Sequence, residues 1–101
     1  MKFAVLFEDD PATGSDVRSK YMPAHLSFLE KHATTAVLAA GPLKTSDGHG
    51  AGGLWLVEAG DATEVEALVK VDPFWPTGLR KSVCILEWNQ VFADGRRLIP
   101  G

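Results

Sequence analysis

The chain contains a single cysteine, Cys84, and no long uninterrupted hydrophobic segment. One cysteine cannot form an internal disulfide, which favours a reducing compartment, so we expect a cytoplasmic protein. The apolar run near the N-terminus extends only from Phe3 to Phe7 before Glu8 interrupts it. Such a run is too short for a signal peptide or a membrane span, and we expect no membrane partner.

A surplus of positive charge is also missing. Lys and Arg number 10 against 13 Asp and Glu, a formal net charge of −3. Nucleic-acid binding is therefore not expected, because no basic excess is present to neutralise phosphates. The sequence has no Cys-x-x-Cys or His-Glu-x-x-His, and its glycine-rich segment 48–53 lacks the Gly-Lys-Ser/Thr of a P-loop. We expect neither a metal nor an organic cofactor.

What is present is the pattern of one α+β domain. Turn residues and helix-capping residues separate segments of strand-forming and helix-forming composition. Strands are predicted over 2–8, 36–40, 54–58 and 82–92, helices over 16–33 and 61–71, and a tight turn or short helix over 73–78. The order β-α-β-β-α-β predicts a ferredoxin-like fold with a four-stranded antiparallel sheet. The domain is expected to span residues 1–92, followed by a polar tail over 93–101.

Right-handed crossovers decide which residues meet in this fold. His25 on the first helix, Asp72 at the end of the second, and the loop around His49 all reach the same end of the sheet. The glycine-rich loop over 43–53 is predicted either to be a flexible hairpin lid at that end or to let a strand start close to a ligand.

Both faces of the predicted strands are apolar. In the first strand Phe3, Val5 and Phe7 alternate with Ala4 and Leu6. Two helices can cover only one face of the sheet, and soluble monomers rarely expose a large apolar patch. The pattern therefore predicts a homodimer in which the uncovered faces meet. The cysteine on the fourth strand is interpreted as a small buried hydrophobic residue rather than a nucleophile.

His25 is the leading catalytic candidate, because an imidazole exchanges protons near neutral pH. Pro23 leaves two possibilities open for its helix. Either the helix is kinked at Pro23, or Pro23 opens the main helix and places His25 in its first turn, where the helix dipole favours a neutral ring. The structural alternative is a histidine that simply packs between helix and sheet.

Asp72 also has two interpretations. Because Pro73 follows it, Asp72 has the sequence of an N-cap for the turn over 73–78. Alternatively, its carboxylate orients His25 through a hydrogen bond. The candidate substrate-binding residues are those expected near this pair, namely Gly41, Pro42, His49 and Phe74.

Six segments occur in order along the chain: Lys2 to Asp9, Pro23 to Leu29, Ala40 to Leu43, Ala51 to Leu54, Asp72 to Phe74, and Glu87 to Asn89. Together they resemble the YCII-related (YciI-like) family over about residues 1–92. The resemblance implies a dimeric α+β barrel built on the ferredoxin-like unit. It also implies a His–Asp site at His25 and Asp72, and activities such as dehydrochlorination of an aromatic ring compound or, in the wider superfamily, lactone isomerisation.

Two functions are compatible with these observations. The first is a cofactor-independent lyase or isomerase in which His25 takes a proton from a small, cyclic or unsaturated acidic substrate. The second is a non-catalytic dimeric module that binds a small molecule or a partner protein through the same cleft. An Asp72 oxygen within hydrogen-bond distance of a His25 nitrogen, in an open pocket, would favour the enzyme.

Overall fold

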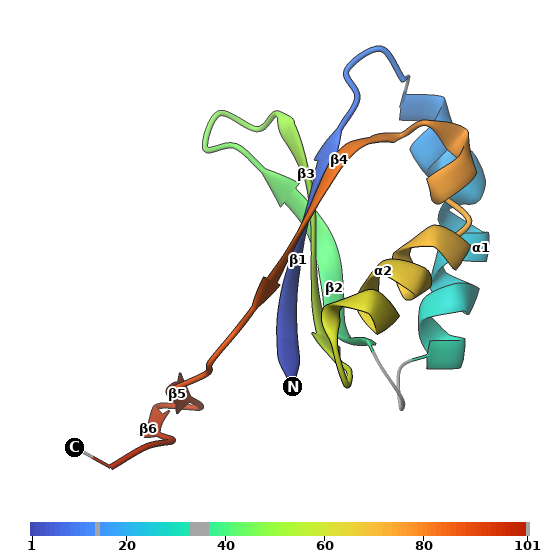
Figure 1. Ribbon diagram of the computed structural model, residues 1–101. Coiled ribbons are helices and arrows are strands. Elements are labelled where there is room, and N and C mark those ends of the chain that lie inside the picture. The colour runs from blue at the N-terminus through green and yellow to red at the C-terminus, as the bar shows by residue number, and fades with distance from the viewer. Residues whose placement is uncertain (14, 33–36, 101) are drawn as a thin grey trace.

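Four antiparallel strands form one sheet in the order β2-β3-β1-β4 in the computed structural model, which describes residues 1–13, 15–32 and 37–100. The strands are β1 (Lys2–Asp9), β2 (Val37–Lys44), β3 (Gly50–Glu58) and β4 (Arg80–Glu87). One face is covered by α1 (Ser15–His32), α2 (Ala62–Val71) and the short 3-10 helix η1 (Trp75–Thr77) (Figure 1). The predicted ferredoxin-like α+β fold is confirmed.

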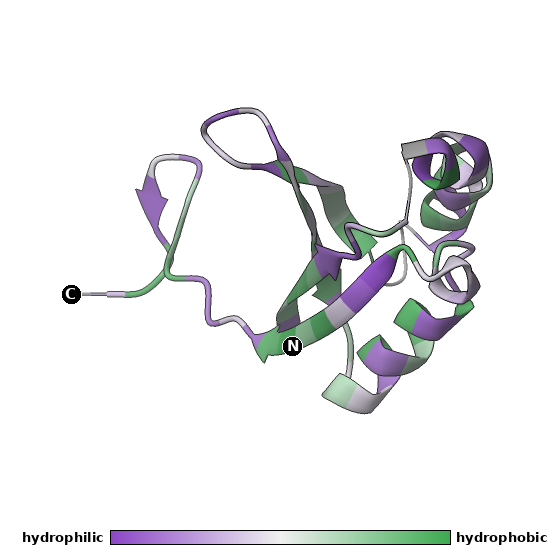
Figure 2. Cartoon of the chain, turned by 90° about the horizontal axis from the view of Figure 1, so that it is seen from above, coloured by the Kyte–Doolittle hydropathy of each residue, from purple (hydrophilic) through white to green (hydrophobic). Residues whose placement is uncertain are grey.

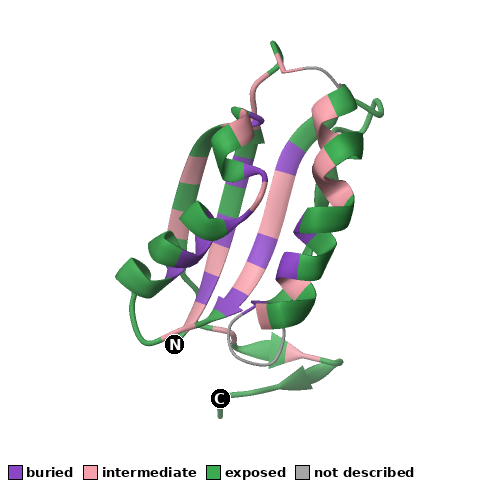
Figure 3. Ribbon diagram, turned by 90° about the vertical axis from the view of Figure 1, so that its right-hand side faces the viewer, coloured by how far each residue is buried: buried purple, intermediate pink, exposed green. Residues whose placement is uncertain are grey.

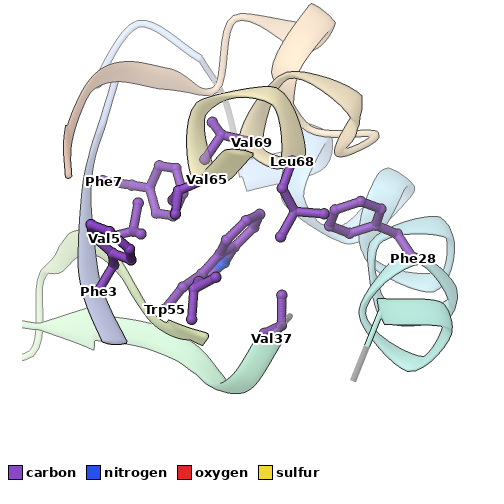
Figure 4. Packing of buried hydrophobic residues seen from close by; sticks show 10 residues of the cluster. Phe3, Val5, Phe7, Phe28, Val37, Trp55, Val65, Leu68 and Val69 are labelled. Atoms are coloured by element: carbon purple, nitrogen blue, oxygen red, sulfur yellow. The ribbon is translucent and has the colours of Figure 1, made fainter. Parts of the chain in front are cut away.

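The hydrophobic core lies between the sheet and the helices. Phe3, Val5 and Phe7 of the central strand β1 all face it and are at most 4% exposed. Val5 pairs with Trp55 on β3 and with Ile85 on β4, so neighbouring strands present apolar side chains to the same face. Figure 4 shows these side chains packed together with Trp55, Phe28, Val37, Val65, Leu68 and Val69. Figure 3 shows the buried positions of the strands on the side of the sheet that the helices cover.

The opposite face of the sheet carries no helix in the described part of the chain. Leu6 pairs there with Leu54 on β3 and Cys84 on β4. Leu6 is 38% exposed and Leu86, on the same face, is 49% exposed. Cys84 is exposed as well, so its interpretation as a buried residue is wrong for a single chain, because it points away from the helices.

The N-cap of α2 is Asp61, whose carboxylate accepts a hydrogen bond of 2.9 Å from the Glu64 backbone N–H. In α1, however, Pro23 lies inside one continuous helix and does not open it. Among the described residues no helix is long and apolar enough to cross a membrane.

The segment predicted as a loop over 43–53 is largely strand. Leu43 pairs with Gly52 and Lys44 with Gly50, which leaves only residues 45–49 as the hairpin turn. Gly52 has φ +128°, and a Cβ built there would meet the Phe7 carbonyl oxygen at 1.8 Å. Glycine is needed at this position because β3 approaches β1 so closely, and its presence had suggested a loop.

The last strand is also shorter than predicted. β4 ends at Glu87 rather than near residue 92, and a separate two-stranded hairpin, β5 (Phe92–Ala93) and β6 (Arg96–Arg97), follows. Asp94 and Gly95 form its turn with positive φ angles of 52° and 74°. We call residues 88–100 the C-terminal arm. It projects from the body on the side of the sheet opposite the helices (Figures 1 and 2).

Candidate active site

His25 lies in the middle of α1, with its side chain turned toward the sheet. It is 8% exposed, one of two buried polar residues in the described part of the chain. Because the helix continues through Pro23, His25 is not in a first turn. The alternative in which Pro23 opens the helix and the helix dipole acts on His25 is therefore wrong.

Asp72 is the other buried polar residue, placed where α2 ends. The backbone leaves the helix there, with φ −65° and ψ 133°. Its Oδ1 atom accepts a hydrogen bond of 3.1 Å from the Phe74 N–H, and its carbonyl oxygen accepts one of 2.9 Å from the Trp75 N–H. Asp72 thus caps the following turn, as one interpretation of the sequence expected.

The two side chains meet in the core. His25 Nδ1 lies 3.0 Å from Asp72 Oδ1, with the two side chains 10% and 0% exposed. The topology of the sheet therefore brings together two residues 47 positions apart. The Asp72 carboxylate caps the following turn and also contacts His25. The structural and the catalytic interpretation of Asp72 are therefore compatible.

A third charged side chain, Arg80 at the start of β4, completes this cluster. Its Nη1 atom lies 2.5 Å from Asp72 Oδ2, and its side chain is 7% exposed. Burial by itself would raise the pKa of Asp72, but the hydrogen bond from His25 and the charge of Arg80 outweigh it and hold that pKa below its usual value. Asp72 is consequently ionised at neutral pH and can only accept hydrogen bonds.

The ionisation of Asp72 determines which nitrogen of the His25 ring carries the proton. An ionised carboxylate requires the Nδ1 atom of His25 to carry the proton and donate it. In the neutral ring Nε2 is then the unprotonated nitrogen, available to accept a proton. This is the arrangement that a carboxylate imposes on a catalytic histidine.

Aromatic rings surround the imidazole. The Phe74 ring lies 4.6 Å from that of His25, and those of Trp55 and Phe28 lie at 6.3 and 6.4 Å in stacked orientation. These rings restrict the rotation of His25 and exclude water from the side facing the core.

A pocket of about 110 Å³ opens beside His25. Three of the four predicted substrate-binding residues, Gly41, Pro42 and Phe74, line it. A second ion pair, Arg18 Nη2 to Asp9 Oδ2 at 2.5 Å, stands at its wall, with both side chains partly exposed. The pocket thus combines an imidazole, apolar walls and two arginines.

His49 is the predicted site residue that this pocket does not include. It lies at the tip of the β2–β3 hairpin with its side chain 79% exposed, and its Nδ1 is 3.1 Å from Asp47 Oδ1. Hydrogen bonds between Thr45 and His49 close the turn. The hairpin projects away from the helices (Figure 1).

Sequence reasoning missed Arg80, Arg18 and Trp55 as members of the site. A signal existed for Arg80, since a cation at the start of an otherwise apolar strand must find a partner if it is buried. Its orientation, however, depends on the register shift between Glu8 and Asp9, where β1 meets β4. Such an irregularity has no clear signature in the sequence.

Over the described ranges, no group of three or more His, Cys, Asp and Glu side chains is arranged to hold a metal ion. The charged groups of the pocket are engaged in the two ion pairs instead.

Comparison with known proteins gives three results. No curated protein matches the chain. Among solved structures, it is similar to 5-chloro-2-hydroxyhydroquinone dehydrochlorinase (TftG) from Burkholderia phenoliruptrix AC1100, determined in complex with 2,5-dihydroxybenzoquinone. The two share 29% sequence identity with a TM-score of 0.74, over 88% of this chain and 94% of that one. The model of the YCII-related domain matches residues 1–89, and the chain belongs to that family.

Proposed function

We propose that this protein is a cofactor-independent enzyme of the lyase or isomerase type, in which His25 transfers a proton on a small, ring-sized organic substrate. The observation that carries the proposal is the 3.0 Å contact between His25 Nδ1 and the fully buried Asp72, at the wall of an open pocket. Asp72 orients the imidazole and stabilises the imidazolium formed when Nε2 accepts a proton.

The proposed step balances without any further reagent. Nε2 of His25 removes a proton from the substrate, and the electron pair of the broken bond forms a new double bond. In an elimination, a leaving group such as halide departs with its own electron pair; in an isomerisation, the proton returns at another atom. The similarity to a dehydrochlorinase, which removes the elements of HCl from its substrate, supports the elimination.

The pocket supports a substrate of about one ring. Its volume is about 110 Å³, below the about 150 Å³ of an enclosed cavity that holds benzene. Because this pocket is open, a single ring would fill it and extend from its mouth. Phe7, Trp55 and Phe74 supply flat apolar walls, while the partly exposed Arg18 supplies hydrogen-bond donors for oxygen substituents. A hydroxylated or quinonoid ring, like the ligand bound to the dehydrochlorinase, has this combination of properties.

We further propose that a second copy of the chain is the protein partner. The open face of the sheet exposes Leu6 and Leu86. The C-terminal arm exposes Phe92, Leu98 and Ile99 by more than half. Arm and open face lie on the same side of the molecule (Figures 1 and 2), so one partner can cover both. A homodimer with its sheets facing each other removes this apolar surface from water.

A binding module without catalysis is the second candidate. The observation that favours it is the hydrogen bond from the Phe74 N–H, which gives Asp72 a structural task independent of any reaction. Such a module would bind the same ring-sized ligands and release them unchanged.

A turnover screen separates the two candidates. Wild type and His25→Ala are assayed against lactones and halogenated aromatic diols, with Ser27→Ala, exposed on the same helix, as the control. The enzyme proposal expects turnover of at least one substrate, a loss of at least about 100-fold in His25→Ala, and normal rates in Ser27→Ala. Ligand binding with no turnover in either class would instead support the binding module.

A further inference from the structure

Arg80 has no task in the proton transfer described above, yet it is built into the site. Its Nη1 atom lies 2.5 Å from Asp72 Oδ2, whereas His25 contacts Oδ1. The carboxylate therefore sits between an imidazole and a guanidinium, with each oxygen committed to a different partner. The Phe74 N–H adds a bond to Oδ1 and fixes the rotation of the carboxylate further.

Aromatic rings hold the guanidinium in place. Its central carbon lies 3.9 Å from the centroid of the Phe7 ring, 5.1 Å from that of Trp55 and 5.5 Å from that of Phe74. Burial lowers the pKa of Arg80, and the attraction of Asp72 opposes that change. Because the pKa of a guanidinium begins from such a high value, Arg80 keeps its charge in this setting.

The charges around Asp72 indicate how Arg80 affects the protonation of His25. A buried carboxylate whose only partner is an imidazole strongly favours the protonated ring. A ring that already carries both protons cannot accept one from a substrate. A permanent positive charge on the second carboxylate oxygen offsets that attraction while leaving the hydrogen bond to Nδ1 intact.

The other charged groups near the ring do not duplicate this effect. From β1 and α1, Asp9 and Arg18 line the same pocket, but they pair with each other at 2.5 Å and largely cancel. His32, farther along α1, has its ring 4.9 Å from that of Phe28, which also stacks on His25. Arg80 is the cation in contact with Asp72.

We propose that Arg80 is a positioning residue that compensates the charge of Asp72, so that His25 remains able to accept a proton from the substrate. This inference rests on the proposed function, and it assigns Arg80 to the resting state of the base rather than to contact with substrate. It also explains why the strand begins with a buried charge where an apolar residue would pack more readily.

The test is an NMR titration of the His25 ring in four proteins: wild type, Arg80→Gln, Arg80→Lys and Lys81→Gln. Lys81 is the matched control, because it adjoins Arg80 on β4 but is exposed, near Glu8. Removing the cation at Arg80 should raise the titration midpoint of His25 by about one pH unit, the size of effect expected from a nearby charge. Arg80→Lys should shift it less, and Lys81→Gln should leave it unchanged.

A wild-type midpoint in Arg80→Gln would overturn the inference, as would an equal shift in Lys81→Gln. If Arg80→Gln does not fold, the comparison moves to Asp72→Asn and the double variant Asp72→Asn/Arg80→Gln, which leaves no unpaired buried charge. The double variant should then titrate at higher pH than Asp72→Asn, and identical midpoints would overturn the inference.

Failure of this inference is distinguishable from failure of the proposed function. If Asp72→Asn shifts His25 but Arg80→Gln does not, only the role of Arg80 is lost. If Asp72→Asn itself leaves the titration unchanged, the His–Asp pair is not coupled and the proposed function loses its basis. Once a substrate is known, the acidic limb of its pH–rate profile should move upward in Arg80→Gln by the same amount as the titration.

Discussion

The two faces of the sheet are built from alternate residues of the same strands, yet they have different environments. On the helix-covered face, Val5 is fully buried beside Trp55, and the charged cluster around Asp72 is buried on the same side. On the open face, Leu6 is 38% exposed, next to a free cysteine at Cys84. The first face is complete within one chain, whereas the second has an apolar surface that one chain leaves uncovered.

The two faces therefore serve different purposes. The covered face holds the fold together and positions the proposed base, so changes there should affect stability and chemistry. The open face should affect association, because its side chains contribute little to the packing of a single chain. Substitutions at neighbouring positions of one strand can therefore test the comparison directly.

The largest effect is expected from placing a charge on the covered face. Val5→Asp would bury a carboxylate with no partner, at a cost of more than about 4 kcal/mol. Chemical unfolding followed by circular dichroism should show a chain that is unfolded or nearly so. A cooperative transition at the wild-type midpoint would show that this face is not the core.

Leu6→Asp, one residue along the same strand, is the matched variant. It should remain folded but lose self-association, since its charge lies on the face that we propose to be the dimer interface. Light scattering at micromolar concentration measures the change. Equal masses for wild type and Leu6→Asp would contradict the proposed interface.

How far the sequence predicted this molecule varies by region. Alternation of Phe3, Val5 and Phe7, with the cap at Asp61, was sufficient for the fold, because local pattern and global topology agree there. The meeting of His25 with Asp72 followed from topology alone. The hairpin strands near Gly52 were missed because glycine has low strand propensity, although pairing with a neighbouring strand overrides it.

Side-chain details of the site were less predictable. Whether Pro23 opens or interrupts its helix depends on packing against the sheet rather than on the sequence of α1. The direction of Arg80 depends on one register shift between β1 and β4. The course of the helix at Pro23 and the direction of Arg80 both depend on tertiary contacts, which the local sequence does not specify.

The second largest effect is expected inside the charged cluster. Asp72→Asn keeps the cap but leaves Arg80 buried without its counterion, and should lower the free energy of unfolding by about 3 kcal/mol. This expectation differs from that for a simple cap, for which asparagine would be almost silent. In Asp72→Asn/Arg80→Met much of the loss should be recovered. A double-mutant cycle by chemical unfolding measures the coupling, and additive effects would show that the ion pair contributes nothing.

Thiol reactivity provides a smaller and purely local comparison. If dimerisation covers the open face, Cys84 should react with a thiol reagent at least about tenfold more slowly in wild type than in the Leu6→Asp variant. Raising the wild-type concentration should slow the reaction further. Equal rates at all concentrations would indicate that the face stays uncovered.

The smallest effect concerns acid stability. Because the folded-state pKa of Asp72 is lowered, its ionisation stabilises the native state above the unfolded-state value of about 3.9. That contribution is lost as the pH falls through the folded-state pKa. The stability difference between wild type and Asp72→Asn should therefore be largest above about pH 5 and narrow on acidification. A difference that is constant with pH would contradict the direction of the shift.

The most direct test of the central claim, that His25 and Asp72 act as one coupled pair, is the NMR titration of the His25 ring in wild type and in folded Asp72→Asn. Loss of the carboxylate removes the charge that stabilises an imidazolium, so the midpoint should fall by about one pH unit in the variant. The measurement requires no knowledge of the substrate. A midpoint that is the same in both proteins would contradict the account.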